Sequence, residues 1–280
     1  MQAVPVQFES LDGLILKGDR YGDPANPPLI FLHGGGQTRH SWGDAAVAVA
    51  RAGWYVINMD SRGHGESDWC PQTNYDVDAF VSDLKAVLNT LASKPVVVGA
   101  SKGGIVALAA ACIDETLLRG IVLVDVTPRL EAAGVGRILE FMRARPDGFA
   151  SLEDAADTIA SYTKRQRTSN LEGLRKNLRE REDGRFIWHW DPHLIGGEFQ
   201  STIQQRCLRL LDDANKITIP TLLVRGAKSD VVSHEGVDEF RQAVKHAEYI
   251  DVAEASHMVA GDQNTVFSEA VINFIGRLDA

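Results

Sequence analysis

A serine between two glycines is the residue best placed to do chemistry in this sequence. Residues 99–103 read G-A-S-K-G and stand between an apolar run at 96–98 and an alanine-rich stretch. On a sharp strand-to-helix turn a serine hydroxyl stands clear of the sheet, and neighbours without side chains relieve the crowding. The turn also places the N–H of Lys102 at a helix N-terminus, where it can face a developing oxyanion. We therefore predict that Ser101 is a nucleophile and that Lys102 acts through its backbone.

A run of glycines upstream could supply a second oxyanion donor. Residues 33–36 read H-G-G-G after a predicted strand, so the backbone there can approach a ligand and direct N–H groups at it. We expect Gly35 to be this donor, with Gly36 as the next choice, and His33 to be a structural residue that hydrogen-bonds the loop. The spacing matches neither the dinucleotide-binding motif nor the P-loop, which argues against nucleotide binding.

Two further residues complete the predicted catalytic set, because a serine hydroxyl needs a base, and a carboxylate fixes the tautomer of that base. Among eight histidines, His257 alone follows the last predicted strand, and we predict that it is the base. Asp230 follows the strand at 221–224, and the chain order Ser, Asp, His favours it as the acid. The rival acid is Asp125, at the end of the strand at 121–124, whose alternative role is to cap the start of an insert.

The segments around these residues alternate between strand and helix. Asp12 and Gly13 suit the tight turn of a hairpin formed by residues 4–10 and 14–17. Short apolar runs then predict buried strands of a mostly parallel sheet, at residues 28–32, 54–59, 95–98, 121–124, 221–224 and 249–252. Helical patterns lie between most of them, at residues 42–51, 77–91, 104–112, 236–245 and 266–278. We therefore predict an α/β fold with helices on both faces of the sheet, which brings the catalytic residues to the carboxyl edge of the strands.

The alternation stops between residues 128 and 217, where the pattern becomes helical throughout. We predict a helical cap at 128–217, inserted between a first core part at 1–127 and a second at 218–280. Residues 144–148 contain a Pro and a Gly, and the pair at 183–184 is Asp-Gly. We expect both to separate cap helices.

Trp188 and Trp190 belong to an aromatic cluster of the predicted cap. We name both as candidate substrate-binding residues, because such rings can line an apolar acyl or alcohol pocket. The alternative, that they fix the cap onto the core, is equally open at this point.

Composition narrows the class of protein. The net charge of −9 and the pI of about 5.4 argue against binding to nucleic acid or to an anionic membrane surface. The three cysteines are far apart and form no C-x-x-C pair, which predicts buried free thiols. With no signal-peptide pattern and no stretch of membrane-spanning length, we expect a cytoplasmic protein. We also expect no cofactor or metal, a small-molecule substrate, and a monomer or homodimer.

With these residues assembled, the chain resembles the α/β-hydrolase superfamily over nearly its whole length. The resemblance is to the branch of small esterases, epoxide-hydrolase-like proteins and cofactor-free haloperoxidases. Residues 60–67, D-S-R-G-H-G-E-S, are similar to that branch's D-x-R-G-x-G-x-S turn, in which His64 would be a scaffold residue. Epoxide hydrolases and haloalkane dehalogenases of this fold use an aspartate where this chain has Ser101, so an aspartyl mechanism is disfavoured.

The resemblance implies cleavage of an ester, thioester, lactone or activated C–C bond. The leading hypothesis is a serine hydrolase in which Ser101 is acylated and His257 then activates water. Alternatives are a C–C bond hydrolase, a perhydrolase or haloperoxidase-like enzyme, and a ligand-sensing protein with slow turnover. Cofactor-free oxygenation is disfavoured, because it would need no serine nucleophile.

Overall fold

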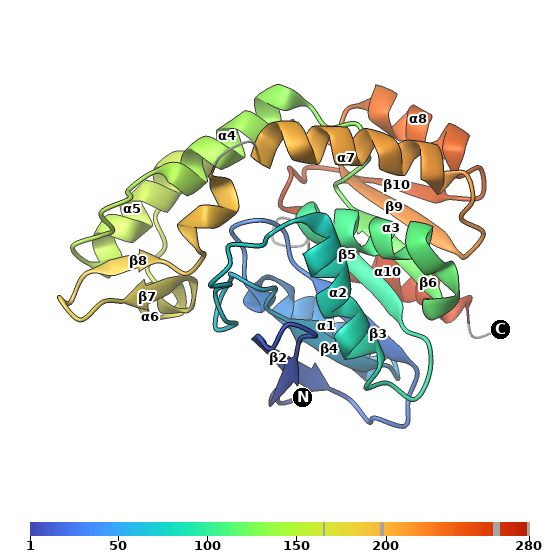
Figure 1. The fold of residues 1–280 in the computed structure, drawn as a ribbon, viewed down its shortest axis with the longest axis horizontal. Coiled ribbons are helices and arrows are strands. Elements are labelled where there is room, and N and C mark those ends of the chain that lie inside the picture. The colour runs from blue at the N-terminus through green and yellow to red at the C-terminus, as the bar shows by residue number, and fades with distance from the viewer. Residues whose placement is uncertain (165, 197–198, 260–263, 279–280) are drawn as a thin grey trace.

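A central sheet of eight strands forms the core of the fold (Figure 1). The computed structural model describes residues 1–164, 166–196, 199–259 and 264–278. The sheet order is β1-β2-β4-β3-β5-β6-β9-β10. Strands β1 and β2 form an antiparallel hairpin, β2 is antiparallel to β4, and every later pair is parallel. The strands are β1 Val4–Glu9, β2 Ile15–Tyr21, β3 Pro28–Leu32, β4 Tyr55–Met59, β5 Val96–Ala100, β6 Gly120–Val124, β9 Thr221–Gly226 and β10 Glu248–Val252.

Helices cover both faces of this sheet. Helices α1 (Gly43–Arg51) and α10 (Asn264–Gly276) pack together on one face. Helices α2 (Val77–Leu88), α3 (Lys102–Asp114) and α8 (His234–Ala243) lie on the other. The alternation of side chains along β3 explains the division, because Leu29 and Phe31 join the first layer whereas Ile30 and Leu32 join the second.

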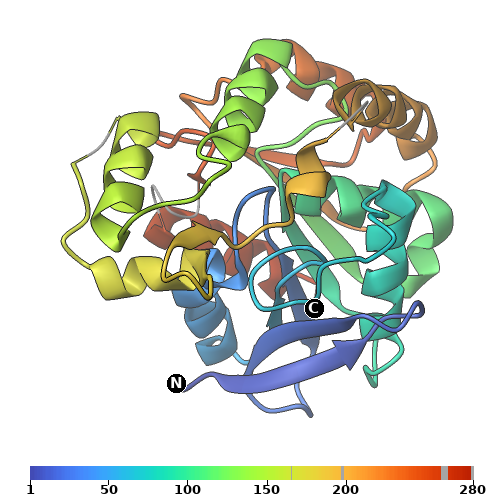
Figure 2. The same ribbon diagram turned by 60° about the vertical axis from the view of Figure 1, so that its left-hand side comes forward.

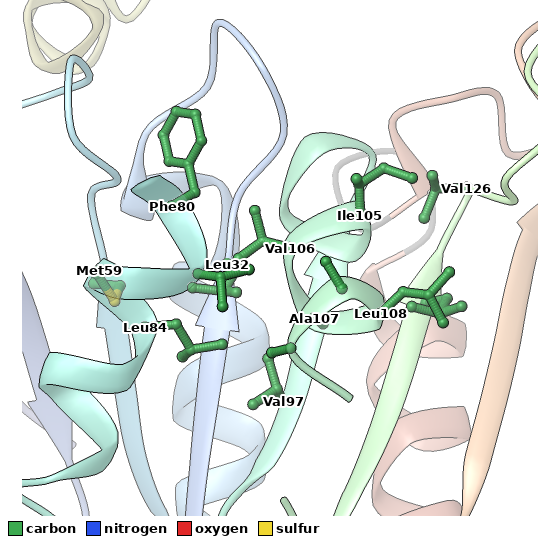
Figure 3. Close-up of a cluster of buried hydrophobic side chains, with 14 of the residues drawn as sticks. Leu32, Met59, Phe80, Leu84, Val97, Ile105, Val106, Ala107, Leu108 and Val126 are labelled. Carbon is green, nitrogen blue, oxygen red and sulfur yellow. The ribbon is translucent and has the colours of Figure 1, made fainter. Parts of the chain in front are cut away.

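Helix α3 is the most deeply buried helix around the predicted nucleophile. Residues 103–111 are all buried, because the sheet lies beneath the helix and α2 and α7 (Phe199–Ala214) pack beside it. Figure 3 shows Leu32 and Val97 of the sheet close to Val106 and Ala107 of α3, with Leu84 of α2 alongside. A helix that is apolar on every side needs such enclosure. The start of α3, which follows Ser101, is therefore held in a rigid layer.

The segment between β6 and β9 contains helices and a small hairpin. Its elements are α4 Ala132–Arg143, α5 Leu152–Thr163, α6 Leu171–Leu174, the 3₁₀ turn η3 Arg175–Asn177, β7 Leu178–Glu180, β8 Phe186–Trp188, the 3₁₀ turn η4 Pro192–Ile195 and α7 Phe199–Ala214. Two further 3₁₀ turns, η1 Arg39–Trp42 and η2 Glu115–Leu117, lie outside this segment. Figures 1 and 2 show α4, α5 and the β7–β8 hairpin projecting from the sheet, whereas α7 returns along α3 and α8.

Most of the elements predicted from the sequence are confirmed, with ends that shift by a few residues. The expectation of helices throughout the insert is wrong, because residues 183–184 form the turn of the β7–β8 hairpin. Gly184 has φ of 75° there, a conformation that glycine adopts readily, and Phe186 to Trp188 are residue types that favour strands. The division at residues 127 and 217 stays a prediction.

Two other expectations concern thiols and membranes. Cys70 and Cys207 are buried free thiols, as predicted, whereas Cys112 is partly exposed. Among the helices described, none combines the length and the apolar character that a membrane span requires.

Candidate active site

Ser101 lies at the sharp turn between β5 and α3 that the sequence predicts, and its backbone there is strained. Its φ is 47° and its ψ is −117°, which for a residue with a side chain costs about 1–3 kcal/mol. The turn is fixed on both sides: the Ser101 N–H donates to Val124 O at 3.0 Å, and Gly104 and Ile105 donate to Ser101 O at 2.9 and 3.0 Å. The serine is partly exposed, so a substrate can approach its hydroxyl.

The glycines flanking Ser101 are required by close backbone contacts. A Cβ atom on Gly99 would lie 2.3 Å from the carbonyl oxygen of Gly103. One on Gly103 would lie 2.3 Å from the carbonyl oxygen of Leu32. Neither obstacle is a side chain that could rotate away, so the turn needs glycine at both positions.

His257 lies in the loop after β10 and pairs with Asp125, the residue that follows β6. The His257 Nδ1 atom is 2.6 Å from Asp125 Oδ2. The same carboxylate accepts hydrogen bonds from the Gly226 N–H at 2.9 Å and from the Ser229 hydroxyl at 2.6 Å. Asp125 is fully buried, while the His257 side chain keeps 17% exposure. A buried carboxylate on Nδ1 fixes the imidazole tautomer that leaves Nε2 free to accept a proton.

The prediction that Asp230 is the acid partner of His257 is therefore wrong. The Asp230 side chain is 52% exposed and forms an ion pair with Arg137 of α4. Both aspartates follow strands whose carboxyl ends meet at one edge, so position alone does not separate them. Asp125 follows β6, the strand next to β5, and its φ of 49° is compatible with the turn that directs it at His257. The alternative role of Asp125, a cap at the start of the insert, is not what the structure shows.

The structure brings Ser101, Asp125 and His257 to one edge of the sheet. The backbone N–H of Ser101 donates a hydrogen bond to the carbonyl oxygen of Val124, the residue before Asp125. The Asp125 carboxylate is in turn hydrogen-bonded to His257. Within the described part of the chain no hydrogen bond joins the Ser101 hydroxyl to His257. Such bonds are often long in the absence of a ligand and tighten when substrate is bound. Two partners of Asp125, the Ser229 hydroxyl and the Gly226 N–H, were not found from the sequence, because neither type of group signals a catalytic contact.

The glycine loop after β3 runs against Ser101. A Cβ atom on Gly34 would lie 3.4 Å from the Ser101 Cβ. The Gly34 N–H donates to Gln37 Oε1 at 3.0 Å, and the Gly36 N–H donates to His64 Nε2 at 3.4 Å. Among the residues that the structure describes, nothing accepts from the N–H of Gly35 or of Lys102. The geometry thus favours Gly35 and Lys102 as oxyanion donors, whereas the N–H of Gly36 is directed at His64.

The Lys102 side chain is an unusual group next to Ser101, the predicted nucleophile. Its Nζ atom is buried and has no hydrogen-bond partner in the described chain, and it lies 4.3 Å from the centre of the Phe80 ring. Burial lowers the pKa of Lys102 to about 7, although the negative charges of Asp83 and Asp60 act in the opposite direction. The lysine is therefore held close to the boundary between its charged and neutral forms at neutral pH.

Helix α4 of the insert lies over the site. Its Met142 packs on the glycine loop, since a Cβ on Gly36 would be 3.3 Å from Met142 Sδ. At the other end of α4, Gly134 lies against the backbone of Asp230, where a Cβ would be 2.2 Å from the Asp230 carbonyl oxygen. The helix thus spans the loops that follow β3 and β9, above the carboxyl edge of the sheet.

Trp188 and Trp190 lie inside the insert, with 7% and 3% exposure. Their rings stack on each other with centroids 4.6 Å apart, and Phe149 meets Trp188 edge-on at 4.7 Å. Each indole N–H donates to a backbone carbonyl near the end of α4: Trp188 to Ala144 at 3.2 Å and Trp190 to Met142 at 3.3 Å. All of these partners belong to the insert, so the contacts brace its own elements against one another. That the two rings fix the cap onto the core, or contact substrate, stays a prediction.

Comparison with known proteins identifies the family of the chain. The chain matches the sequence model of the alpha/beta hydrolase fold family over residues 27–262. It is 32% identical over 263 residues to esterase Rv0045c of Mycobacterium tuberculosis, covering 90% of this chain and 83% of that protein. It is 30% identical over 250 residues to 3-hydroxybutyrate-oligomer hydrolase of Cupriavidus necator, covering 85% of each.

Solved structures show the same fold. That of E-2-(acetamidomethylene)succinate hydrolase superposes with a TM-score of 0.85 at 22% identity, covering 98% of this chain and 100% of that one. The chain therefore belongs to the α/β-hydrolase family. The named relatives support carboxylic ester hydrolase as its enzyme class.

Proposed function

We propose that this protein is a serine hydrolase that cleaves a small ester, lactone or thioester through an acyl-enzyme intermediate. The observation that carries the proposal is the buried contact between Asp125 and His257, beside a serine held on a strained turn. The arrangement supplies a nucleophile, a base with a fixed tautomer and two backbone N–H groups that have no acceptor among the described residues. These are the parts that acyl transfer requires.

The first half of the reaction forms the acyl-enzyme. Ser101 Oγ attacks the carbonyl carbon of the substrate while its proton passes to His257 Nε2. The carbonyl oxygen becomes an oxyanion, which the N–H groups of Gly35 and Lys102 stabilise. The intermediate then collapses, the bond to the leaving group breaks, and His257 returns its proton to the departing alcohol or thiol.

The second half releases the acid. A water molecule gives a proton to His257 Nε2 and attacks the acyl carbon, the oxyanion forms again, and Ser101 leaves with the proton from His257. Asp125 stabilises the imidazolium in both halves. Its three hydrogen-bond donors, including His257 itself, keep the carboxylate in place.

The experiment that tests an acyl-enzyme uses esters that share one acyl group. Phenyl, p-nitrophenyl and ethyl butyrate would be hydrolysed in the presence of methanol, and the ratio of methyl butyrate to butyric acid measured. A common acyl-enzyme predicts the same ratio for all three, because the leaving group has departed before methanol or water attacks. Ratios that vary with the leaving group would exclude the intermediate.

Substrate class is tested alongside. A panel of butyrate ester, γ-butyrolactone and butyryl thioester, compared by kcat/KM, ranks the three kinds of acyl compound. We expect turnover of at least one of them that is lost in Ser101→Ala. If the parent protein turns over none of the three, the proposed function fails.

A further inference from the structure

His189 is a buried residue of the insert that hydrogen-bonds two loops of the core. It follows β8 and has 1% exposure. Its Nδ1 is 2.8 Å from the Gly65 N of the turn at residues 60–67. Its Nε2 is 3.3 Å from the carbonyl oxygen of Gly36, in the glycine loop that borders Ser101. Its own carbonyl oxygen accepts from the Trp69 indole at 3.1 Å.

The partners of His189 define its tautomer. An amide N–H can only donate, so Nδ1 must be the unprotonated nitrogen that accepts from Gly65. Nε2 therefore carries the proton and donates to the Gly36 carbonyl. Burial lowers the pKa of His189 to about 3, which keeps the ring neutral at physiological pH.

Gly36 is held by imidazole rings at both of its polar groups. Its N–H donates to His64 Nε2, and its carbonyl accepts from His189. Its φ of 69° is in the left-handed region, where glycine has little intrinsic preference for one conformation. The two rings are neighbours, with centroids 5.9 Å apart. Because Gly36 follows Gly35 directly, these two hydrogen bonds restrain the loop next to the Gly35 N–H.

We propose that His189 is a positioning residue through which the insert sets the direction of the Gly35 N–H. The proposal rests on the proposed function, in which that N–H binds the oxyanion. His189 touches no reacting atom: its Nε2–H fixes the Gly36 carbonyl, and its Nδ1 fixes the insert to the core turn at Gly65. If the insert were displaced, the hydrogen bond from His189 Nε2 to the Gly36 carbonyl would be lost, and the Gly35 N–H would lose its alignment with the oxyanion.

Two substitutions separate the two nitrogens. In His189→Gln the side-chain amide can reach the position of Nε2 and donate to the Gly36 carbonyl, while the bond to Gly65 is lost. In His189→Asn the side-chain oxygen can take the position of Nδ1 and accept from Gly65, while the bond to Gly36 is lost. Each variant loses the ring and one hydrogen bond, so both serve as matched controls for stability.

The proposal predicts different kinetics at similar melting temperatures. His189→Asn should lower kcat by roughly tenfold or more with little change in KM, because the donor acts on the transition state. It should weaken binding of an aliphatic trifluoromethyl ketone, which forms a tetrahedral adduct, by a similar factor. His189→Gln should stay within about threefold of the parent in both measurements, since a retained donor keeps the loop aligned.

The outcomes are distinct from those that test the proposed function. An inactive parent protein would remove the function itself. An active parent with equal losses of kcat and ketone affinity in the two variants would overturn only the positioning role of His189. If His189→Asn does not fold, the imidazole ¹⁵N resonances of His189 in the parent protein decide: we expect them to shift when the ketone binds, and unchanged resonances would overturn the proposal.

Discussion

Asp125 Oδ2 and His257 Nδ1 lie 2.6 Å apart, although Asp125 precedes the insert in the sequence and His257 follows it. The carboxylate belongs to the loop after β6, and the imidazole belongs to the loop after β10. Asp125 has no exposed surface, so its charge is stabilised by the groups that donate to it and not by water. This pair, and not one involving Asp230, is the contact on which the proposed mechanism rests.

The first prediction separates the two aspartates. Asp125→Asn should lower kcat by about 10³–10⁴-fold, because an amide next to Nδ1 no longer holds the required tautomer of His257. The matched control Asp230→Asn removes a half-exposed ion pair with Arg137 and should leave kcat within about twofold. Steady-state hydrolysis of p-nitrophenyl butyrate by both variants makes the comparison. A larger loss in Asp230→Asn would return the acid role to Asp230.

The sequence predicted the sheet and its turns well because these depend on local patterns. The hairpin turn at Asp12 and Gly13, the buried strands and the turn at Ser101 each follow from residues that are neighbours in the chain. The choice of acid could not be made this way. Asp125 and Asp230 follow adjacent parallel strands, and what separates them is packing: Ser229 and Gly226 enclose one, and Arg137 pairs with the other.

The role of His189 was also beyond the sequence. The His189 ring contacts backbone groups of Gly36 and Gly65. Every residue has such groups, so the residue types at these positions do not indicate the contact. The hairpin of β7 and β8 does leave a signal in the sequence, the Asp-Gly pair at 183–184 beside aromatic and β-branched residues. The same pair also suits a break between helices, which is the expectation that the structure corrects.

The second prediction concerns the stability of the protein and the buried amine of Lys102. Lys102→Met should raise Tm at about pH 7 by roughly 3 °C or more, because an unpaired polar group in a buried site costs about 1–3 kcal/mol. The pKa of Lys102 is about 7 in the folded protein, below the usual 10.5. Between these two pH values the amine therefore binds more protons in the unfolded chain than in the folded one. The parent protein therefore gains stability, relative to the variant, as pH rises through this window.

The measurement is Tm of parent and variant across that range. The difference in Tm by which Lys102→Met exceeds the parent should be largest at about pH 7 and should shrink towards about pH 10. An advantage that does not change with pH would show that the amine is not the cause. A variant less stable than the parent at about pH 7 would contradict the burial of an unpaired Nζ.

The third prediction concerns the stacked tryptophans of the insert. Trp190→Ala should lower the free energy of unfolding by about 3–5 kcal/mol, because the ring is buried against Trp188 and bonded to Met142. It should depress kcat/KM for acetate and benzoate esters by the same factor, since it loosens the insert without altering a pocket wall. A selective loss on the benzoate ester at an unchanged Tm would instead assign Trp190 to substrate binding.

The nucleophile is tested most directly by the mass of the intact protein after reaction with a fluorophosphonate. A nucleophilic Ser101 predicts one adduct per chain, which peptide mapping of the labelled protein places on the peptide that contains Ser101, together with complete loss of ester hydrolysis. Ser101→Ala should take up no adduct and should retain at most a small residual rate from the oxyanion donors. An adduct on another residue, or undiminished ester hydrolysis by pure Ser101→Ala, would contradict the mechanism.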